Sequence, residues 1–418
     1  MPATEMTASV EAALQELDKL GIEHKEVEKP DSVDSLQSIM AKASSRDLKV
    51  LPLGGGTSLG AANLPQRVDI VLDMTGLNEI IQFDPKNLNL SVQAGQNIQA
   101  VNRFLAEQDR GFFLPLDPLL PERATIGGAY ASNSSGPWRQ FYGTIRDLAL
   151  GAGALDAGGH AVKFGGTTVK NVSGYDLTKF FIGSAGSLCL ITRVSFRILP
   201  LPDAFSTCEV LLKDEEQAGQ LLSDVRSSVL VPSALIAVRE KKDPGLRVIA
   251  GFEGHPKAVE RQNRDLAKLG EEYGCSSRVL TGREKVQSRI REAFNPDPAA
   301  EKTATFKVSV PISKGAQTLG EVRQKAEDQA FEAKLVLLAG NGVLYVHLDY
   351  ADEADLFPFV RFLKDTAAKQ QGHAVPVQAP YSVISSWGLR GDSVVDRLIL
   401  QPIKNQFDPS GILLPVNA

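Results

Sequence analysis

Hydrophobic residues recur at helical and strand spacing along the first half of the chain. An amphipathic helix over residues 7–20 is predicted by apolar side chains three or four positions apart: Val10, Leu14, Leu17 and Leu20. Further helices are predicted over 33–45 and 97–110. Apolar or alternating runs, separated by Gly, Asp-Pro or Asn, predict strands and hairpins in 47–53, 67–77, 79–96 and 148–164.

Beyond the proline-rich stretch 197–205, the hydrophobic pattern repeats. The order strand, helix, strand, strand, helix is predicted over 205–274 and again over 304–371, with a helical stretch near 282–293 between them. Two such units indicate one antiparallel sheet backed by helices, with ferredoxin-like connectivity. The tail 398–415 predicts a short helix that ends at Asp-Pro, followed by a closing turn.

Composition indicates a soluble protein of more than one domain. The chain has 418 residues, 43% of them hydrophobic and 23% charged, with a net charge of −5. The basic residues are scattered, which argues against nucleic acid or an anionic membrane surface as the main partner. The sequence predicts no signal peptide and no transmembrane segment. The three cysteines are far apart, which argues against a disulfide framework and against a zinc or iron–sulfur site. We therefore expect a cytoplasmic protein, with any association with the inner membrane made through partners.

The glycine-rich stretch LPLGGGTSLG (51–60) follows a predicted strand. A Walker A loop requires a lysine after its last glycine, and none follows Gly60. A Rossmann turn requires GxGxxG before a long helix, whereas this loop leads to another strand within about ten residues. Two interpretations remain: a surface loop, or a nest of backbone N–H groups that holds a pyrophosphate.

A second stretch, ATIGGAYASNSSGPWRQFYGTIRD (124–147), is poor in bulky residues and rich in hydroxyl groups. Ile126 and Tyr130 make it too apolar for an exposed flexible loop. A flat, polar, extended ligand would require a buried stretch of this kind. The two stretches together favour a ligand site over a surface loop.

Four segments carry a resemblance to a known family: 51–60, 117–151 (DPLLPERATIGGAYASNSSGPWRQFYGTIRDLALG), 165–200 (GGTTVKNVSGYDLTKFFIGSAGSLCLITRVSFRILP) and 404–415 (KNQFDPSGILLP). Together they resemble the FAD-binding PCMH-type flavoproteins, the vanillyl-alcohol oxidase superfamily. Within it they are most similar to the FAD-binding subunit of glycolate oxidase. The resemblance is dense over 30–200, returns at 399–415, and is only architectural between.

The resemblance implies where FAD binds. The glycine loop matches the segment around the pyrophosphate: Gly54, Gly55, Gly56, Thr57 and Ser58. The second stretch matches the wall along the ribityl chain and isoalloxazine: Pro118, Thr125, Gly127, Gly128, Ser132, Asn133 and Gly136, continued by Tyr142, Gly143 and Ile145. A later segment matches the neighbourhood of the adenosine and flavin through Gly186 and Ile191. A side chain at Gly55 or Gly128 is expected to meet the ligand or to strain the backbone.

The chain departs from the catalytic members of the family in the second domain. Those members carry an HxGDGNxH-like motif that supplies metal ligands and a base. The corresponding stretch here, LLAGNGVLYVHLDY (337–350), lacks the first histidine, and His347 is expected to be a packed strand residue. Ala185 stands where catalytic relatives usually have glutamate, and Cys189 where they have glycine. Catalytic residues stay unassigned and no metal site is expected.

These observations predict an α+β protein: an N-terminal helix (1–27), a two-part PCMH-type FAD domain (28–200), a cap or substrate-side domain with a ferredoxin-like repeat (201–394), and a C-terminal segment returning to the FAD domain (395–418). The predicted function is the FAD-binding subunit of a glycolate or other 2-hydroxy acid dehydrogenase complex. It would hold FAD non-covalently and pass electrons on. Its partners would be a catalytic flavoprotein subunit and an iron–sulfur subunit. The alternatives are a self-sufficient D-lactate or 2-hydroxy acid dehydrogenase and a scaffold subunit with a vestigial flavin site.

Overall fold

The structure is a computed structural model that describes residues 11, 13–15, 17–167, 175–241, 245–297, 300, 302–387 and 396–416. It divides into two compact units. Unit 1 contains the described residues of 1–135, 143–201 and 380–418, and unit 2 those of 136–142 and 202–379. The short segment 136–142 therefore belongs with unit 2, although the sequence placed it in the first domain.

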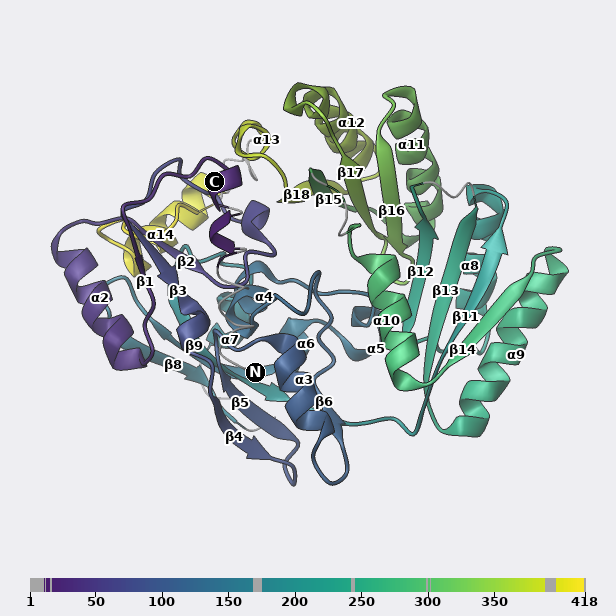
Figure 1. Cartoon of the computed structure of the whole chain (residues 1–418), viewed down its shortest axis with the longest axis horizontal. Helices are drawn as coiled ribbons and strands as arrows, with labels where there is room; N and C mark the ends of the chain where they lie inside the picture. Colours follow the sequence, from purple (N-terminus) through teal and green to yellow (C-terminus); the bar gives the residue numbers. More distant parts are fainter. Residues whose placement is uncertain are drawn as a thin grey trace. The chain divides into compact units, whose positions relative to one another are not determined.

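Unit 1 contains a parallel three-stranded sheet, an antiparallel five-stranded sheet and a strand pair (Figure 1). The parallel sheet has the order β1-β3-β2: β1 (Glu26–Glu28), β3 (Ile70–Asp73) and β2 (Val50–Leu53). The antiparallel sheet has the order β4-β5-β9-β7-β8: β4 (Ile80–Asp84), β5 (Asn89–Gln93), β9 (Leu190–Arg197), β7 (Ala149–Leu155) and β8 (Ala161–Gly165). The pair is β6 (Phe112–Phe113) with β10 (Leu199–Pro200).

The helices of unit 1 are α2 (Val33–Ser45), α3 (Ile98–Ala106), α4 (Ile126–Ser132), α6 (Ile145–Leu148), α7 (Leu177–Phe180), α13 (Tyr381–Ser386) and α14 (Gln401–Phe407). Helix α2 has the predicted bounds, because the Ser32 hydroxyl caps it by accepting from the Ser35 N–H at 3.2 Å. The described residues among 11–19 are helical, and the rest of the predicted helix 7–20 lies outside the described residues or in the turn at Leu20. Helix α14 ends before Asp408, as the Asp-Pro pair predicts.

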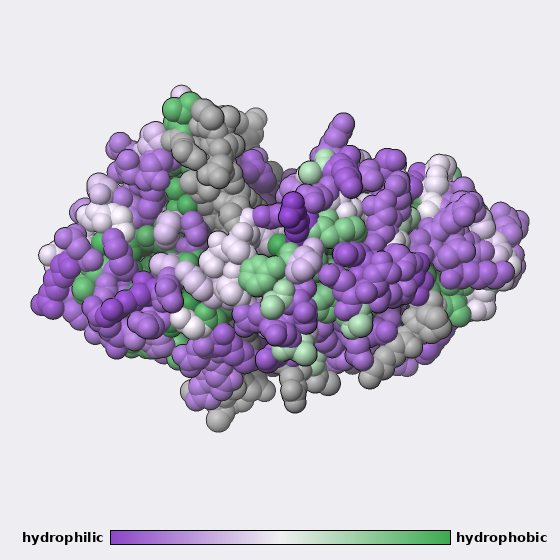
Figure 2. Space-filling view, turned by 90° about the horizontal axis from the view of Figure 1, so that it is seen from above, coloured by the Kyte–Doolittle hydropathy of each residue, from purple (hydrophilic) through white to green (hydrophobic). Residues whose placement is uncertain are grey.

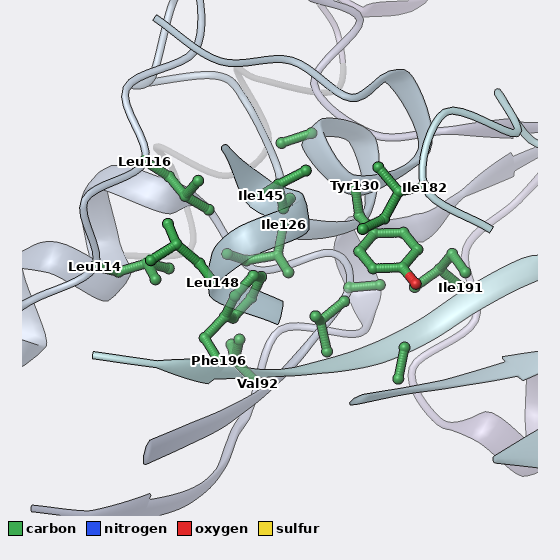
Figure 3. Close-up of a cluster of buried hydrophobic side chains, with 14 of the residues drawn as sticks. Val92, Leu114, Leu116, Ile126, Tyr130, Ile145, Leu148, Ile182, Ile191 and Phe196 are labelled. Atoms are coloured by element: carbon green, nitrogen blue, oxygen red, sulfur yellow. The ribbon is translucent and has the colours of Figure 1, made fainter. Parts of the chain in front are cut away.

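The main core of unit 1 lies between α4 and the antiparallel sheet. Figure 3 shows Ile126 and Tyr130 of α4 above Val92 of β5 and Phe196 of β9, with Ile145 and Leu148 of α6 beside them. All six side chains are fully buried. Tyr130 is polar at its tip, and its hydroxyl donates to the Thr178 carbonyl oxygen. This packing fixes one face of α4, so that the helix presents its other face to the pocket described below.

Unit 2 is an eight-stranded antiparallel sheet of order β14-β11-β13-β12-β16-β17-β15-β18. Its strands are β11 (Ala204–Leu212), β12 (Ala234–Arg239), β13 (Leu246–Gly254), β14 (Ser277–Thr281), β15 (Thr303–Ser309), β16 (Glu332–Leu338), β17 (Val343–Asp349) and β18 (His373–Gln378). Its helices are α5 (Arg139–Tyr142), α8 (Glu215–Ser227), α9 (Pro256–Glu272), α10 (Arg283–Phe294), α11 (Gly315–Asp328) and α12 (Leu356–Lys369).

The predicted repeat is present in this sheet (Figure 1). The first copy is β11-α8-β12-β13-α9 and the second is β15-α11-β16-β17-α12. Strand β11 shows that helices cover both faces: its Ser206 contacts Asn263 of α9, whereas Glu209 pairs with Arg289 of α10. The α+β class and the antiparallel second sheet are thus confirmed. Strands β14 and β18 were not predicted, and each lies at one edge of the sheet.

The face shown in Figure 2 is mostly hydrophilic, with smaller hydrophobic areas between the polar residues. Among the helices that the structure describes, none has the length and apolar character needed to cross a bilayer.

Candidate cofactor site

A pocket in unit 1 brings together segments that are far apart in the sequence. The space between its walls is about 830 Å³, with open solvent at the mouth included. Its walls are the end of β2 with the glycine loop after it, one face of α4, the turn before β9, and Leu414 near the C-terminus. Most lining side chains are small or apolar, so a flat ligand can lie close to the backbone.

Packing within unit 1 explains why three glycines follow β2. A Cβ atom on Gly55 would overlap the Arg123 carbonyl oxygen, and one on Gly54 would overlap the Thr125 hydroxyl. Gly56 has a φ of +68°, a conformation that only glycine adopts without steric cost. The segment 123–125 therefore presses on one side of the loop, and the other side borders the pocket. A side chain at Gly55 would strike Arg123 before any ligand, which corrects the expectation for this position.

The glycine loop supplies hydrogen-bond donors to the pocket. Within the described part of the chain, the backbone N–H groups of Gly55, Gly56 and Thr57 have no protein acceptor. The hydroxyl-bearing residues Thr57 and Ser58 also line the pocket. Successive N–H groups around a positive-φ residue form a concave anion site. This part of the pocket fits the two phosphates of a dinucleotide.

Helix α4 provides a wall made of small residues: Gly127, Gly128, Ala131 and Ser132. Thr125 caps the helix, its hydroxyl accepting from the Gly128 N–H at 3.2 Å, and the Gly127 N–H donates to the Ala94 carbonyl oxygen at 2.6 Å. These two N–H groups are therefore already bonded within the protein. A Cβ on Gly127 would come within 2.8 Å of the Ala94 Cβ, whereas a Cβ on Gly128 would meet only the Thr125 hydroxyl, at 3.0 Å. Packing against Ala94 therefore requires glycine at position 127, whereas the absence of a side chain at Gly128 leaves space that a ring can occupy.

The turn before β9 forms the third wall. Ala185 and Gly186 both have positive φ, +51° and +76°, and a Cβ on Gly186 would lie 2.8 Å from Pro52. Cys189 lines the pocket and is 4% exposed. Burial raises the pKa of the Cys189 thiol, which keeps it protonated and unreactive.

Of the residues implied by the resemblance, the pocket brings together Gly54, Gly55, Gly56, Thr57, Ser58, Thr125, Gly127, Gly128, Ser132, Gly186 and Ile191. Four others belong to unit 1 but not to the pocket lining: Pro118, Asn133, Gly143 and Ile145. Ile145 is a core residue with no exposed surface, and Asn133 is the left-handed C-cap of α4. Sequence reasoning missed the lining residues Met74, Ala94 and Leu414, because isolated apolar residues give no signal that separates a pocket from a core.

Gly136 and Tyr142 belong to unit 2. The Tyr142 hydroxyl donates to the Glu253 carboxylate at 2.5 Å, and the Ser233 hydroxyl donates to the other oxygen of that group at 3.0 Å. Burial raises the pKa of Tyr142 and also that of Glu253. Gln140 adds an anchor through its side-chain amide, which donates to the Pro232 carbonyl oxygen at 2.7 Å. The segment 136–142 is therefore tied to the sheet of unit 2.

His347 is a packed strand residue, as the sequence predicts. It is fully buried on β17, with Nδ1 3.0 Å from the Thr305 hydroxyl and Nε2 3.1 Å from the Phe294 carbonyl oxygen. Burial, reinforced by the charge of Lys334, lowers the pKa of His347 to about 3. The imidazole is therefore neutral at pH 7 and both its nitrogens are engaged. Within the described residues, no group of three or more His, Cys, Asp or Glu side chains could hold a metal ion.

We expect His347 to make unit 2 sensitive to acid. The unfolded chain binds a proton at this residue below its ordinary pKa of about 6.5, whereas the folded chain binds it only near pH 3. Stability is therefore fully present above pH 6.5 and falls as the pH is lowered toward 3. Between pH 7.5 and 5.0 this contribution is roughly 2 kcal/mol.

Thermal unfolding of the parent and of His347→Gln at both pH values checks this expectation. The variant should lose less stability on acidification than the parent. His160→Gln, which changes an exposed histidine, should behave like the parent. Equal acid sensitivity in all three proteins would contradict the role assigned to His347.

Arg146 of α6 is bonded within unit 1 and does not reach the pocket. From the sequence alone, Arg146 is equally consistent with contact to an anionic ligand and with an ion pair to Asp147. In the structure its guanidinium donates to the Lys179 carbonyl oxygen at 3.2 Å, and Asp147 accepts from the Thr144 N–H in a capping box. Neither side chain lines the pocket.

Two family models match the chain. The FAD binding domain matches residues 25–165, and the C-terminal domain of FAD linked oxidases matches 202–374. Among curated proteins, a glycolate oxidase subunit of Bacillus subtilis is 32% identical over 49% of this chain and 43% of its own length. D-lactate dehydrogenase of Archaeoglobus fulgidus is 26% identical over 93% of this chain and 90% of its own length. A mitochondrial D-2-hydroxyglutarate dehydrogenase of Arabidopsis thaliana is 26% identical over 92% and 73%.

Solved structures share the fold at low identity. An alkyldihydroxyacetonephosphate synthase has a TM-score of 0.71 at 19% identity and covers 94% of this chain and 76% of its own. A glucooligosaccharide oxidase of Acremonium strictum has a TM-score of 0.72 at 14% identity and covers 99% and 98%. The FAD model includes the glycine loop and α4, and the pocket they border has the donors and the open space that FAD requires. The chain is therefore an FAD-dependent oxidoreductase of the PCMH-type flavoprotein family, with an FAD-binding domain followed by an FAD-linked oxidase C-terminal domain.

Proposed function

We propose that this protein is the FAD-binding subunit of a complex that oxidises glycolate or a similar 2-hydroxy acid. The observation that carries the proposal is the contrast between the two units. Unit 1 has a pocket suited to FAD. In unit 2, by contrast, the single histidine of the stretch 337–350, His347, is buried with both ring nitrogens bonded. Under this proposal residues 28–200 and 395–418 form the FAD domain and 201–394 the cap.

In this assignment the chain's own groups bind and orient the cofactor. The N–H groups of the loop at Gly55–Thr57 would hold the pyrophosphate, and the Gly128 face of α4 would lie against the ring system. FAD would supply the two-electron chemistry. Cluster-binding cysteines are not available in this chain, since its three cysteines are far apart in the sequence. Electron transfer onward would therefore use an iron–sulfur partner, and a catalytic flavoprotein subunit would provide the base.

A second function has an observation in its favour. The relatives that match over most of this chain are D-lactate and D-2-hydroxyglutarate dehydrogenases, whereas the glycolate oxidase subunit matches over about half of it. A self-sufficient dehydrogenase acting on a D-2-hydroxy acid is thus the alternative. The two proposals differ in whether the chain alone accepts electrons from the acid.

We expect the isolated chain to be yellow and to release its FAD on acid precipitation. The glycine loop 51–60 contains no histidine or cysteine for a covalent link, and the one cysteine in the pocket lining is buried and protonated. Absorbance of the supernatant and of the redissolved pellet measures the partition. Flavin retained in the pellet would contradict non-covalent binding, and its release from Cys189→Ser would then identify the attachment site.

A further inference from the structure

The C-terminal segment 408–416 is built into unit 1 beside the cofactor pocket. The Val50 N–H of β2 donates to the Ile412 carbonyl oxygen at 2.8 Å, and the Lys49 ammonium donates to the Gly411 carbonyl oxygen at 2.6 Å. Leu414, two residues after Ile412, lines the pocket. The segment therefore lies along the strand that leads into the glycine loop, although more than 350 residues separate the two in sequence.

A buried lysine holds this segment from the other side. Lys404 of α14 is 5% exposed and its ammonium pairs with the Asp408 carboxylate. The same ammonium donates to the Ser187 carbonyl oxygen at 2.7 Å and to the Leu413 carbonyl oxygen at 3.4 Å. Ser187 lies between the pocket residues Gly186 and Cys189, and Leu413 directly precedes Leu414. One ammonium group thus bonds to the backbone directly beside two walls of the pocket.

Asp408 completes the arrangement. It is 2% exposed, and its carboxylate accepts from the N–H groups of Ile412 and Leu413, both at 2.9 Å. Burial lowers the pKa of Lys404, while the hydrogen bond and charge of Asp408 oppose that shift. Because the ammonium, the carboxylate and four backbone groups satisfy one another out of water, removal of one member leaves the rest unpaired. Small rearrangements of the turn at Ser187 and of Leu414 would follow.

We propose that Lys404 is a positioning residue of the FAD site: it locks the turn before β9 and the C-terminal segment into the walls that the cofactor contacts. This role requires only that FAD binds in the pocket, so it holds for a subunit and for a self-sufficient dehydrogenase alike. Under this proposal the C-terminal segment is also part of the cofactor site, because the hydrogen bonds described above hold Leu414 in the pocket lining.

Lys404→Met tests the proposal, because methionine keeps the length of the side chain and removes the charge. We expect the dissociation constant for FAD to rise roughly tenfold or more, since the pocket walls are no longer pre-organised. Lys334→Met is the matched control. That lysine is also 5% exposed and bonds to a backbone carbonyl oxygen, of Glu292 at 2.5 Å, but it belongs to unit 2. The control should lose thermal stability to a similar extent while FAD binding stays within about twofold.

Two further measurements distinguish a loss of FAD affinity from a loss of folding. Lys404→Arg retains the charge and should bind FAD more tightly than Lys404→Met. Hydrogen exchange of the unaltered protein adds a readout that needs no variant: FAD should slow exchange at the Ile412 and Leu413 amides. A parent-like dissociation constant in Lys404→Met, or exchange at these amides that FAD does not change, would overturn the proposal.

Discussion

Replacement of Gly128 by valine should strongly weaken FAD binding while the protein stays folded. A Cβ at this position meets only the Thr125 hydroxyl, at 3.0 Å, so the added methyl groups would extend into the pocket. Overpacking of a filled site costs about 1–3 kcal/mol, which corresponds to a loss of affinity of roughly 5- to 150-fold. Valine is also a better helix former than glycine, so α4 itself should tolerate the change.

Fluorescence titration of the apoprotein with FAD measures this effect, and thermal unfolding without FAD reports the stability. Gly320→Val in α11 of unit 2 is the control, because its Cβ would make only an ordinary contact, 3.4 Å from Glu215. Gly55→Val should behave differently from both. Its side chain would displace the Arg123 carbonyl oxygen, so it should lower stability together with affinity. If Gly128→Val binds FAD like the parent, α4 does not face the cofactor.

The second large effect concerns catalysis: the FAD-loaded chain alone should not turn over glycolate or D-lactate. Oxidation of a 2-hydroxy acid needs a group that accepts the hydroxyl proton, and a positioned base contributes about 10²–10⁴-fold. His347 would have to break its hydrogen bonds to Thr305 and Phe294 before it could act as this base. Dye-linked turnover by the purified chain measures the activity, which should remain near background and appear only when partner subunits are added.

Measurable turnover by the chain alone would favour the self-sufficient dehydrogenase. The five histidines of the sequence then give a short set of variants. Loss of that activity in His373→Ala, with FAD binding intact, would point to the histidine on β18. Retention of activity in all five single variants would point to a base of another kind, such as the Tyr142–Glu253 pair.

The sequence predicted the elements with strong periodicity and missed those without it. The repeat in unit 2 was visible because β11, β12, β13, β15, β16 and β17 are rich in apolar residues, in continuous or alternating runs. Strand β14 was not, since four of its five residues are exposed. Helix α4 has the sequence IGGAYAS, whose small residues give little helical signal. Its ends come from Thr125 and from Asn133 in the left-handed conformation.

The candidate site was predictable where glycine and hydroxyl residues concentrate, as in 54–58 and 125–132. Two features depended on the structure. Glycine is required at position 55 because the carbonyl oxygen of Arg123, 68 residues away, occupies the place of a Cβ atom. No local sequence pattern indicates that contact. The bond from Lys404 to Ser187 joins residues 217 apart. The contribution of the C-terminal segment to the pocket therefore depends on the folded structure and cannot be predicted from local sequence patterns.

The central claim is that this chain binds FAD but needs partners to oxidise a 2-hydroxy acid. Anaerobic stopped-flow absorbance of the FAD-loaded chain, mixed with millimolar glycolate or D-lactate, tests it most directly. We expect the oxidised flavin spectrum to persist with the chain alone and to bleach only when the partner subunits are present. Rapid bleaching by either acid with no other subunit in the cell would contradict the account and identify a self-sufficient dehydrogenase.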